Sequence, residues 1–584
     1  MLNLTPRFSQ SFPHELPKTL QPITEKSPTL ARILAARGIT EVRQLHTDFT
    51  VMLAASGLKG IATAVTLLDA AIDSGKKILI VGDFDCDGAT STALMVRVLR
   101  EMGANVDYLV PDRFKYGYGL TPEIVELGIA TYSPDMIVTV DNGISSYAGV
   151  TAAKNQGVTV IITDHHLTTQ APPPADAVVN PNQLECEFGS KSLVGVGVAF
   201  YVLGNLAKVR RQAGKSTSQV SRYLDLVALG TVADVGVFDQ NNRLLVHHGL
   251  QAIRQRACCV GILALLEVAG KSAQTMTVQD FGFIVAPRIN AAGRMDNMRI
   301  GIECLLTDDW GQAGQLAHQL DKLNRERRSV ESEMRQQADT ILQNLEFQPT
   351  SRSIILYQDD WHQGVIGIVA GRLKEQHHVP AIVFAPADTE AVGEADSIKG
   401  SARSIAGIHI RDAIERVAQT HPDLISHFGG HAMAAGLTLK KQNFEPFCQA
   451  FNAVMAGVDN SVFAETLYSD GELLPREFSL DFYEQLQNIT VWGNGFVAPT
   501  FDGVFVIQDF RVLKEQHLKL WLSHPNVPFT LEAIWFGVDF DKLDSRQIHR
   551  ANTRIHLLYE LGKNEYNQKV SIQLMVKNGA LLTN

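Results

Sequence analysis

Short apolar runs that end on acidic residues or histidines restrict how this chain can fold more than any other feature. The run in KKILIVGDFDCDG is followed directly by three aspartates, and MIVTVDNG, VTVIITDHH and LVALGTVADV reach acids in the same way. The first three runs are short enough to be buried strands, and helical patterns separate them. This alternation predicts a mostly parallel sheet with helices on both faces, whose polar strand ends meet at one edge.

The side chains at these ends are those that a hydrolytic metal site requires. They are Asp83, Asp85, Asp87, Asp141, Asp164, His165, His166 and Asp234. Asp85 and Asp87 alternate, so an extended segment would point both carboxylates to the same side. Carboxylates combined with imidazole favour Mn²⁺ or Mg²⁺. Two such ions roughly 3.5–4 Å apart can activate a bridging water and stabilise both reacting oxygens of a phosphate ester.

A single aspartate at a strand end is more often a helix cap or a turn former than a metal ligand. Asp83 fits that description, and we expect it to orient the loop or to act behind the metal ligands. Four acidic ends, one of which also carries two histidines, are much harder to explain as caps. We therefore interpret the set as a site for two metal ions.

Length and composition indicate the class of protein. At 584 residues the chain is too long for one core, and about 150 residues per domain suggests roughly four domains. The net charge of −10, from 52 basic and 62 acidic side chains, argues against a generally basic surface but not against a local basic channel. Six cysteines without CxxC spacing favour a reducing compartment, and no apolar stretch approaches the ~18 residues of a membrane span. We expect a cytoplasmic protein that does not enter membranes.

Changes of pattern along the chain suggest five segments. Residues 1–70 have helical spacing, and residues 71–300 hold the alternating strands and helices with the acidic ends. Residues 301–348 contain a long helical stretch with a thin apolar seam, which suits a helix that connects two domains. A second α/β pattern follows at 349–458. Residues 459–584 carry several short strands with turn signals, which predict a small OB-like barrel.

Basic, aromatic and small polar residues form a separate set that could bind a nucleic acid. PDRFKYGYGL combines a cation with aromatic rings, the pairing that holds a phosphate and stacks a base. PRINAAGRM places charged and amide groups among small residues, and KGSARS has the composition of a phosphate cradle. The candidates are Arg113, Tyr116, Tyr118, Arg288, Asn290, Arg294, Lys399, Ser401, Arg403 and Ser404. Any one of these arginines is explained equally well as a surface residue, so the prediction rests on the sets.

The order of the acidic motifs DFDCDG, VDNG, TDHH and VADV resembles that of the DHH phosphoesterase superfamily, and FGGHAMAAG is similar to a motif of the DHHA1 domain that accompanies it. The resemblance implies that the metal ligands are Asp85, Asp87, Asp141, His165 and Asp234. It implies that Asp164 and His166 support the site or the substrate. It also implies that His431, beside Gly429 and Gly430, approaches the scissile phosphate from the second domain. The implied catalytic residues are Asp87, Asp164, His165, His166 and His431.

Within the superfamily, the length, the long helix and the β-rich C-terminal segment are most similar to single-strand-specific 5′→3′ DNA exonucleases. This resemblance implies a hydrolase that uses two Mn²⁺ or Mg²⁺ ions and releases 5′-mononucleotides in DNA repair and recombination. It implies that Arg113 and the KGSARS segment hold the 5′-phosphate. Single-stranded DNA is the implied substrate, a single-strand-binding protein and a helicase are candidate partners, and we expect a monomer.

Two other interpretations stay open. A DHH phosphodiesterase for short RNA or small nucleotides is usually far shorter than this chain. A non-catalytic DHH scaffold in a replication complex is expected to lack one of the acids of the first motif, and all of them are present. A pyrophosphatase fits less well, because an inorganic substrate needs neither aromatic residues nor a barrel. The residues leave open the physiological metal, the polarity, activity on RNA and the oligomeric state.

Overall fold

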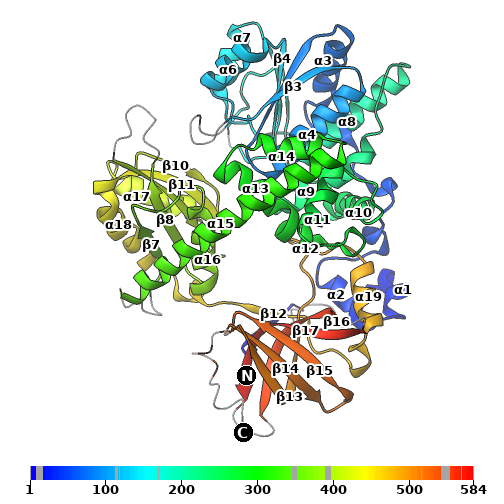
Figure 1. Ribbon diagram of the computed structural model, residues 1–584, viewed down its shortest axis with the longest axis vertical. Coiled ribbons are helices and arrows are strands. Elements are labelled where there is room, and N and C mark those ends of the chain that lie inside the picture. The colour runs from blue at the N-terminus through cyan, green and yellow to red at the C-terminus, as the bar shows by residue number, and fades with distance from the viewer. Residues whose placement is uncertain are drawn as a thin grey trace. The chain divides into compact units, whose positions relative to one another are not determined.

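The computed structural model describes residues 2–7, 17–111, 116, 119–168, 170–344, 351–387, 396–514, 516–538, 540, 543, 553–566 and 569–582. The chain divides into two compact units, and most of their elements are labelled in Figure 1. The first combines Met1–Met52, Val237–His247 and Thr466–Asn584, and the second combines Leu53–Gly236 with His248–Glu465. Each unit is therefore built from segments that are far apart in the sequence.

A five-stranded parallel sheet lies at the centre of the first α/β part of the second unit. Its strand order is β3-β2-β4-β5-β6, and every neighbouring pair is parallel. The strands are β2 (Lys77–Gly82), β3 (Asn105–Leu109), β4 (Met136–Val140), β5 (Thr159–Thr163) and β6 (Ala177–Val179). Strands β2, β4 and β5 are almost fully buried, because their Ile, Val and Leu side chains meet helices on both faces. The predicted parallel sheet is confirmed.

Helices cover both faces of this sheet. Helices α6 (Pro122–Tyr132) and α7 (Tyr147–Asn155) pack in one hydrophobic core with the Leu79, Ile137 and Val160 side chains of the strands. The helices on the other face are α3 (Ile61–Asp73), α4 (Cys86–Glu101) and α8 (Gly195–Gln212). Helix α4 contacts β2, β3 and β4, and α8 contacts β4 and β5. Both α4 and α8 begin at the carboxyl edge of the sheet, so their first turns face the polar strand ends.

A group of helices continues the chain beyond this sheet. They are α9 (Leu224–Ala233), α10 (Gln240–Arg254), α11 (Val260–Val268), α12 (Val278–Asp280), α13 (Ala286–Met295) and α14 (Arg299–Leu306). Helix α4 packs against α8, α9, α13 and α14, so it is enclosed on several sides. This enclosure explains why even the polar residues Thr90, Ser91 and Thr92 of α4 are fully buried.

The 35-residue helix α15 (Trp310–Asn344) connects this part of the unit to a second α/β part. It packs on α11, α13 and α14. Near its C-terminal end, Met334, Ala338 and Leu342 enter the hydrophobic core below the second sheet. The predicted connecting helix is therefore present, and both of its ends are anchored by apolar contacts.

The second sheet has the strand order β10-β11-β9-β8-β7. Its strands are β7 (Ile354–Tyr357), β8 (Ala381–Pro386), β9 (Ser397–Arg403), β10 (His427–Gly430) and β11 (Ala434–Lys440). Only the β7–β8 pair is parallel, and the other pairs are antiparallel. Helices α17 (Ile410–Thr420) and α18 (Phe444–Ala456) share a core with one face, whereas α15 and α16 (Ile366–His377) share a core with the other.

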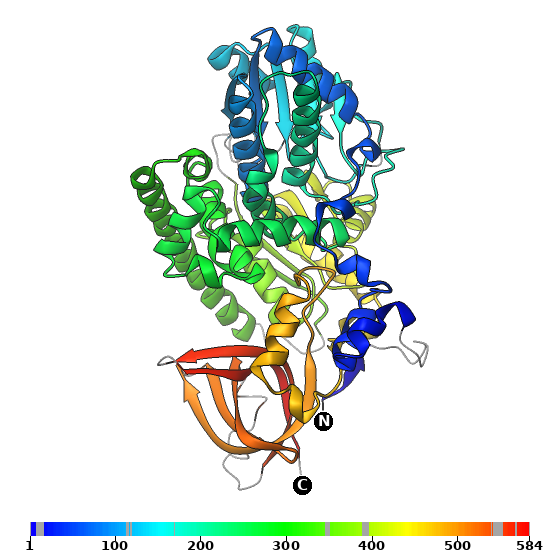
Figure 2. The same cartoon turned by 90° about the vertical axis from the view of Figure 1, so that its right-hand side faces the viewer.

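The C-terminal segment forms a closed five-stranded barrel in the first unit, coloured orange to red in Figure 2. Its strands are β13 (Phe501–Leu513), β14 (His517–His524), β15 (Val527–Phe536), β16 (Arg554–Tyr566) and β17 (Lys569–Leu582). The barrel closes through the parallel pair β15–β17, while the other pairs are antiparallel. Closure leaves no unpaired sheet edge, and the predicted OB-like barrel is confirmed.

The N-terminal residues belong to the same unit as the barrel. Strand β1 (Leu4–Pro6) pairs in parallel with β12 (Leu467–Ser469), and the guanidinium of Arg37 forms a buried ion pair with Asp470 at 2.7 Å. The short helices here are α1 (Gln21–Thr24), α2 (Pro28–Ala35) and α19 (Leu480–Asn488). Helical spacing within residues 1–70 carries no signal for pairing with a segment near residue 467.

Among the described residues, no single helix has the length and apolar composition of a membrane span. The segments Phe49–Gly57 and Ile61–Asp73 meet those two criteria only when they are taken together, and they are bent by 86° relative to each other.

Candidate active site

The acidic strand ends meet at the carboxyl edge of the first sheet. Three groups of side chains each place their ligand atoms within 4.8 Å of one another. The groups are Asp83, Asp85 and Asp141; Asp87, His165 and Asp234; and Asp141, His165 and His166. Because the groups share members, they form one continuous cluster with donors for more than one cation. The five residues that were predicted as metal ligands all lie in this cluster.

The imidazole of His165 points into a ring of carboxylates. Its Nε2 atom lies 3.0 Å from Asp141 Oδ1, 3.6 Å from Asp234 Oδ2 and 3.9 Å from Asp87 Oδ2. This buried nitrogen has no partner in hydrogen-bonding geometry within the described part of the chain. Burial lowers the pKa of His165 to about 4, so the ring is neutral and can donate a lone pair. Carboxylates and a neutral imidazole are the donor set that Mn²⁺ and Mg²⁺ accept.

Asp87 is fixed by the N-terminus of a helix. The backbone N–H of Gly195 donates to Oδ2 at 2.7 Å, and the N–H of Val196 donates to Oδ1 at 2.8 Å. Burial, followed by the negative charge of Asp85, raises the pKa of Asp87 to about 7. Burial and neighbouring aspartates also raise the pKa values of Asp141 and Asp234. Such crowding of acids is unfavourable for ionised carboxylates unless a cation lies between them.

Asp141 is presented by an unusual backbone conformation. Its φ angle is 62°, in the left-handed region that few residues other than glycine adopt. Gly195 leaves room for this conformation, because a Cβ atom at position 195 would lie 2.6 Å from the Cβ of Asp141. The turn after β4 and the start of α8 are therefore fitted to each other.

Asp164 supports the neighbouring histidines. Its Oδ1 atom accepts from the backbone N–H groups of His165 and His166 and lies 2.7 Å from Nδ1 of His166, while Oδ2 accepts from the N–H of Ile144. Burial works to raise the pKa of Asp164, but the hydrogen bond and charge of His166 outweigh it and lower the value to about 2. Burial works to lower the pKa of His166, but Asp164 raises it to about 9. In the metal-free protein His166 is therefore a cation within the cluster.

Comparisons with known proteins agree along almost the whole chain. Models of the DHH family N-terminal domain, the DHHA1 domain and the RecJ OB domain match residues 77–231, 351–457 and 469–578. The single-stranded-DNA-specific exonuclease RecJ of Haemophilus influenzae is 45% identical over 559 residues, which cover 94% of this chain and 95% of that protein. This chain belongs to the RecJ family.

Solved RecJ structures extend the likeness to the fold. A crystal structure of RecJ from Thermus thermophilus in complex with Mn²⁺ has a TM-score of 0.80 and 28% identity, and the match covers 97% of this chain and 78% of that one. A complex of RecJ from the same organism with Mg²⁺ has a TM-score of 0.75 and 26% identity, with coverage of 97% and 77%. The donor set in this RecJ family member suits the same two cations.

The PRINAAGRM segment lies in α13, which contacts the DFDCDG loop that carries Asp85 and Asp87. The side-chain oxygen of Asn290 accepts from the backbone N–H of Cys86 at 2.8 Å. Gly293 allows close packing, because a Cβ atom there would lie 2.0 Å from the carbonyl oxygen of Phe84. Asn290 thus contacts the DFDCDG loop itself, a role that the sequence pattern did not reveal.

The two arginines of α13 have protein partners. Arg288 is buried, and its guanidinium forms an ion pair with Asp321 of α15 at 2.8 Å. Arg294 donates from Nη1 to the carbonyl oxygen of Gly364 in the second α/β part at 3.2 Å. Arg288 therefore joins two helices, and Arg294 links α13 to the turn before α16 in the second α/β part.

Three of the four KGSARS candidates share one face of β9. Burial alternates along the strand, so Lys399, Ser401 and Arg403 point to the face covered by α16. Nη1 of Arg403 donates to Ser401 Oγ at 3.1 Å. Ser404 differs, because its buried hydroxyl donates to the carbonyl oxygen of Ile408. We refer to Lys399, Ser401 and Arg403 as the cradle set. Ser404 instead stabilises the turn that follows β9.

His431 lies opposite the DHH triplet. Its ring centroid is 6.5 Å from that of His166, and the two rings are nearly parallel at 25°. Burial, followed by the charge of His166, lowers the pKa of His431. Gly430 has a φ of 145°, and a Cβ atom there would lie 2.4 Å from the carbonyl oxygen of Ala434, so glycine is needed to make this turn. Gly429 has open space at its Cβ position.

Of the three candidates in PDRFKYGYGL, only Tyr116 lies among the described residues. Arg113 and Tyr118 lie outside the described residues. Tyr116 packs against the hydrophobic core of the first sheet.

Two asparagines that sequence reasoning missed hold the DHH backbone. Asn182 Nδ2 donates to the carbonyl oxygen of His165, and Asn180 Nδ2 donates to that of His166. The only available signal was their position in the turn after β6, which is common for asparagine in any protein.

Proposed function

We propose that this chain is a Mn²⁺- or Mg²⁺-dependent exonuclease that degrades single-stranded DNA from its 5′ end to 5′-mononucleotides. Membership of the RecJ family supports the substrate, since the H. influenzae relative is named a single-stranded-DNA-specific exonuclease. The observation that carries the chemistry is the cluster around His165, in which a buried Nε2 atom faces three carboxylates. Such a cluster is arranged to hold cations rather than to stabilise the fold.

The proposed metal ligands are Asp85, Asp87, Asp141, His165 and Asp234. When bound, the ions would supply an activated water and would stabilise negative charge on the phosphate. Asp87 is held in position by the start of α8, and the DHH backbone is held by Asp164, Asn180 and Asn182. Asp83 accepts from the N–H of Phe84 and orients the loop behind the ligands.

Two histidines would act on the scissile phosphate itself. His166 is positively charged because Asp164 raises its pKa to about 9, and it faces His431 across the site. A fixed cation and a second imidazole can donate hydrogen bonds to phosphate oxygens as negative charge develops on them. The charge on His166 requires no rearrangement during the reaction, because Asp164 already holds the ring.

The terminal phosphate would bind at the cradle formed by Lys399, Ser401 and Arg403. Arg403 has a partly buried guanidinium beside a hydroxyl group, and a planar guanidinium can bind a phosphate through two parallel hydrogen bonds. Arg113 is proposed to assist it. Binding at a chain end, rather than within a chain, would make the enzyme an exonuclease.

The barrel would hold the following nucleotides. Phe529 and Phe536 of β15 are about half exposed, at 49% and 54%, and exposed rings can stack bases without sequence preference. We propose further that the enzyme acts as a monomer in the cytoplasm, where its six cysteines stay reduced. A single-strand-binding protein and a helicase are the proposed partners.

The direct test is digestion of one oligonucleotide labelled at either end. We expect mononucleotides to appear first from the 5′-labelled end of single-stranded DNA with Mn²⁺ or Mg²⁺. A duplex should resist, and a chelator should stop the reaction. Early release from the 3′ end would refute the polarity. Faster hydrolysis of a matched short RNA would favour a phosphodiesterase for small nucleotides.

A pair of histidine variants tests the metal cluster. His165→Ala should abolish hydrolysis while most DNA binding is kept, because the site loses one ligand. His318→Ala is the matched control, since His318 lies exposed on α15 and its ring makes a hydrogen bond to the carbonyl oxygen of Gly314 on the same helix. Normal turnover by His165→Ala would refute the ligand assignment.

A further inference from the structure

The most exposed apolar side chains of the described residues lie next to the candidate active site. Phe283 is 72% exposed, Leu167 is 65% exposed and Val235 is 64% exposed, and no other large apolar side chain in the described part of the chain exceeds these values. Leu167 follows His166 and Val235 follows Asp234 directly in the sequence. Single apolar residues are common on protein surfaces, but apolar surface that gathers beside a polar site usually contacts a ligand.

Phe283 projects from a widened turn in the helix that leads into α13. Residues Phe281–Val285 form a π-helical turn, in which the N–H of Ala286 donates to the carbonyl oxygen of Phe281. Pro287 explains the turn, because it has no N–H to donate and its ring would clash with the carbonyl oxygen four residues earlier in an α-helix. Such turns are rare and frequently occur at functional sites.

The ring of Phe283 is not part of the hydrophobic core. Phe281 and Val285 are fully buried on one side of the turn, and Phe283, halfway between them in the sequence, lies on the opposite side. The turn is held from its buried side, where Nη1 of Arg288 donates to the carbonyl oxygen of Ile284 at 2.7 Å. Truncation of Phe283 should therefore leave the turn in place.

The widened turn packs against the helix that ends at Asp234. It contacts α9, and a Cβ atom at Gly282 would lie 3.6 Å from Cγ1 of Val232. Val232 lies two residues before Asp234, in the last turn of α9. Phe283 therefore stands beside the end of α9, where the candidate ligand Asp234 is held.

Helix α13 fixes the place of Phe283 relative to the acidic residues. Asn290, which contacts the DFDCDG loop, lies seven residues after Phe283. At ~1.5 Å per residue, this is a separation of about 10 Å along the helix. Four residues further on, Arg294 contacts Gly364 in the turn before α16. The helix thus passes from Phe283, along the DFDCDG loop, to the second α/β part.

The start of α16 leads on to the cradle set. A Cβ atom at Gly367 would lie 2.9 Å from Nη2 of Arg403 and 2.9 Å from Oγ of Ser401. The cradle set and Phe283 are therefore at opposite ends of α13, with the DFDCDG loop between them. A strand whose 5′-phosphate is held by the cradle set, and which is cut beside the DFDCDG loop, continues towards Phe283.

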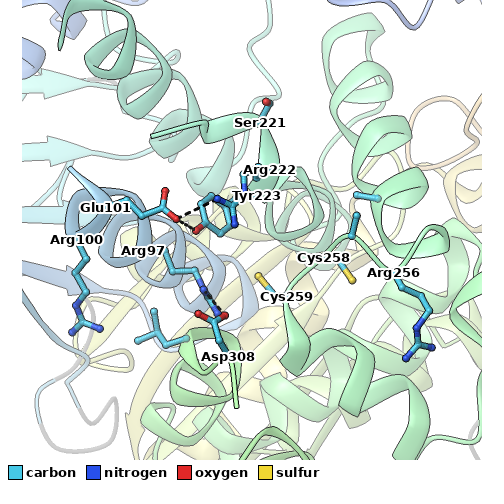
Figure 3. Close-up of a pocket in the computed structure, with 13 residues that line it drawn as sticks. Arg97, Arg100, Glu101, Ser221, Arg222, Tyr223, Arg256, Cys258, Cys259 and Asp308 are labelled. Atoms are coloured by element: carbon cyan, nitrogen blue, oxygen red, sulfur yellow. Dashed lines mark hydrogen bonds and ion pairs between the residues drawn. The ribbon is translucent and has the colours of Figure 1, made fainter. Parts of the chain in front are cut away.

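The pocket in Figure 3 shows an aromatic ring in a different setting. Tyr223 is the aromatic residue among those that line it. The guanidinium carbons of Arg97 and Arg222 each lie 5.8 Å from the centre of this ring, and its hydroxyl donates to Glu101 at 2.6 Å. The ring of Tyr223 is thus engaged by neighbouring side chains, whereas that of Phe283 is largely open to solvent.

We propose that Phe283 stacks on a base of the DNA strand just 3′ of the scissile phosphate, and so holds the strand that remains after each cleavage. The inference rests on the proposed function, because binding of the 5′ end at the cradle set gives the strand this direction. About 10 Å corresponds to roughly three stacked nucleotides at ~3.4 Å each. Phe283 is therefore assigned to the second, third or fourth nucleotide from the 5′ end. An open aromatic face suits this contact, because every base can stack on it.

Oligonucleotides that lack one base test the contact. A series of 5′-phosphorylated single strands carries one abasic nucleotide at each of the first six positions, and release of the first nucleotide is measured with Mn²⁺. In the parent enzyme, KM should rise about fivefold or more when the missing base is the one that stacks. In Phe283→Ala, KM for the intact strand should be raised by the same factor, and removal of that base should have no further effect. Phe283→Trp should restore the parent pattern.

Two controls separate the contact from a structural effect. Phe49→Ala removes another exposed phenylalanine, which is 45% exposed and belongs to the other compact unit, and it should leave the KM values unchanged. If Phe283 only supported α9, its truncation would act through Asp234 and raise the Mn²⁺ requirement. We expect the Mn²⁺ requirement and kcat at saturating DNA to stay unchanged, and circular dichroism checks that each variant is folded.

Three results would overturn the inference. An unchanged KM in Phe283→Ala would show that the ring contacts something other than DNA, such as a protein. A penalty for the missing base that persists in Phe283→Ala would place the stacking partner elsewhere. A raised Mn²⁺ requirement with an unaltered abasic pattern would make Phe283 a structural residue. Failure of the parent enzyme to degrade single-stranded DNA from its 5′ end would instead refute the proposed function, so the two failures can be told apart.

Discussion

The backbone N–H of Gly195 donates to the carboxylate of Asp87 at 2.7 Å, and position 195 also lies directly against Asp141. One glycine at the start of α8 is therefore in contact with two residues of the metal cluster that come from different strand ends. A helix N-terminus stabilises a carboxylate through its N–H groups and its dipole. The same N–H groups hold the carboxylate in one orientation.

Gly195→Ala should reduce turnover roughly 10–100-fold, because a displacement of a ligand by about 1 Å has effects of that size. The new Cβ atom would lie 2.6 Å from the Cβ of Asp141 and 2.7 Å from its Oδ1 atom, so Asp141 must move. Steady-state kinetics at saturating Mn²⁺ provides the measurement. Gly204→Ala on the same helix is the control, since nothing lies within 4 Å of its Cβ position. Equal activity of the two variants would show that Asp141 tolerates the displacement.

Asn290→Ala should weaken metal binding by about tenfold, the usual effect of losing a group that orients a metal ligand. The variant removes the acceptor for the N–H of Cys86 in the first metal-binding loop. Activity is measured against Mn²⁺ concentration and, separately, against DNA concentration. We expect a higher Mn²⁺ requirement with an unchanged KM for DNA. An unchanged Mn²⁺ requirement with a higher KM for DNA would instead indicate that Asn290 contacts the substrate, as the sequence suggested.

That the acidic side chains of the site meet at one edge of the sheet could be predicted, because they follow local patterns. Asp83, Asp141 and Asp164 stand directly after apolar runs that form parallel strands, and the edge where such strands end is fixed by the topology. The barrel and α15 were predictable for the same reason, since alternation and a long seam are local features.

Contacts between distant segments were not predictable from those patterns. Asn290 is 204 positions from Cys86, and Gly195 is 108 positions from Asp87. Arg288 carries the same charge whether it meets a phosphate or Asp321, and only the packing of α13 on α15 decides between them. The pairing of β1 with β12 has no local signal at all.

Arg403→Ala should remove the preference for a 5′-phosphate. The guanidinium lies beside Ser401 on the face of β9 that meets α16, and truncation takes away the group proposed to bind the terminal phosphate. Rates on the same oligonucleotide with a 5′-phosphate and a 5′-hydroxyl give the ratio, which should fall about tenfold or more towards equality. Arg416→Ala, on the exposed side of α17, should keep the ratio of the unchanged enzyme. A preserved ratio in Arg403→Ala would exclude the cradle.

The metal-free protein should lose stability as pH rises from about 6.5 to 9. Asp164 raises the pKa of His166 to about 9, and burial raises that of Asp87 to about 7, against about 6.5 and 3.9 in an unfolded chain. The folded state therefore binds more protons than the unfolded chain over this range. The free energy of unfolding falls as His166 and Asp87 lose these protons. Burial lowers the pKa of His165 to about 4, so this residue makes stability rise with pH, but only below about pH 6.5, where the unfolded chain binds its proton.

Thermal unfolding at several pH values, with chelator and with saturating Mg²⁺, measures this dependence. The midpoint of the chelated protein should fall with rising pH, and Mg²⁺ should reduce the slope because the cation neutralises the ionised carboxylates. His166→Gln should lessen the slope in the chelated protein, since one of the two titrating groups is gone. A midpoint that rises with pH in the presence of chelator would contradict the charges assigned to His166 and Asp87.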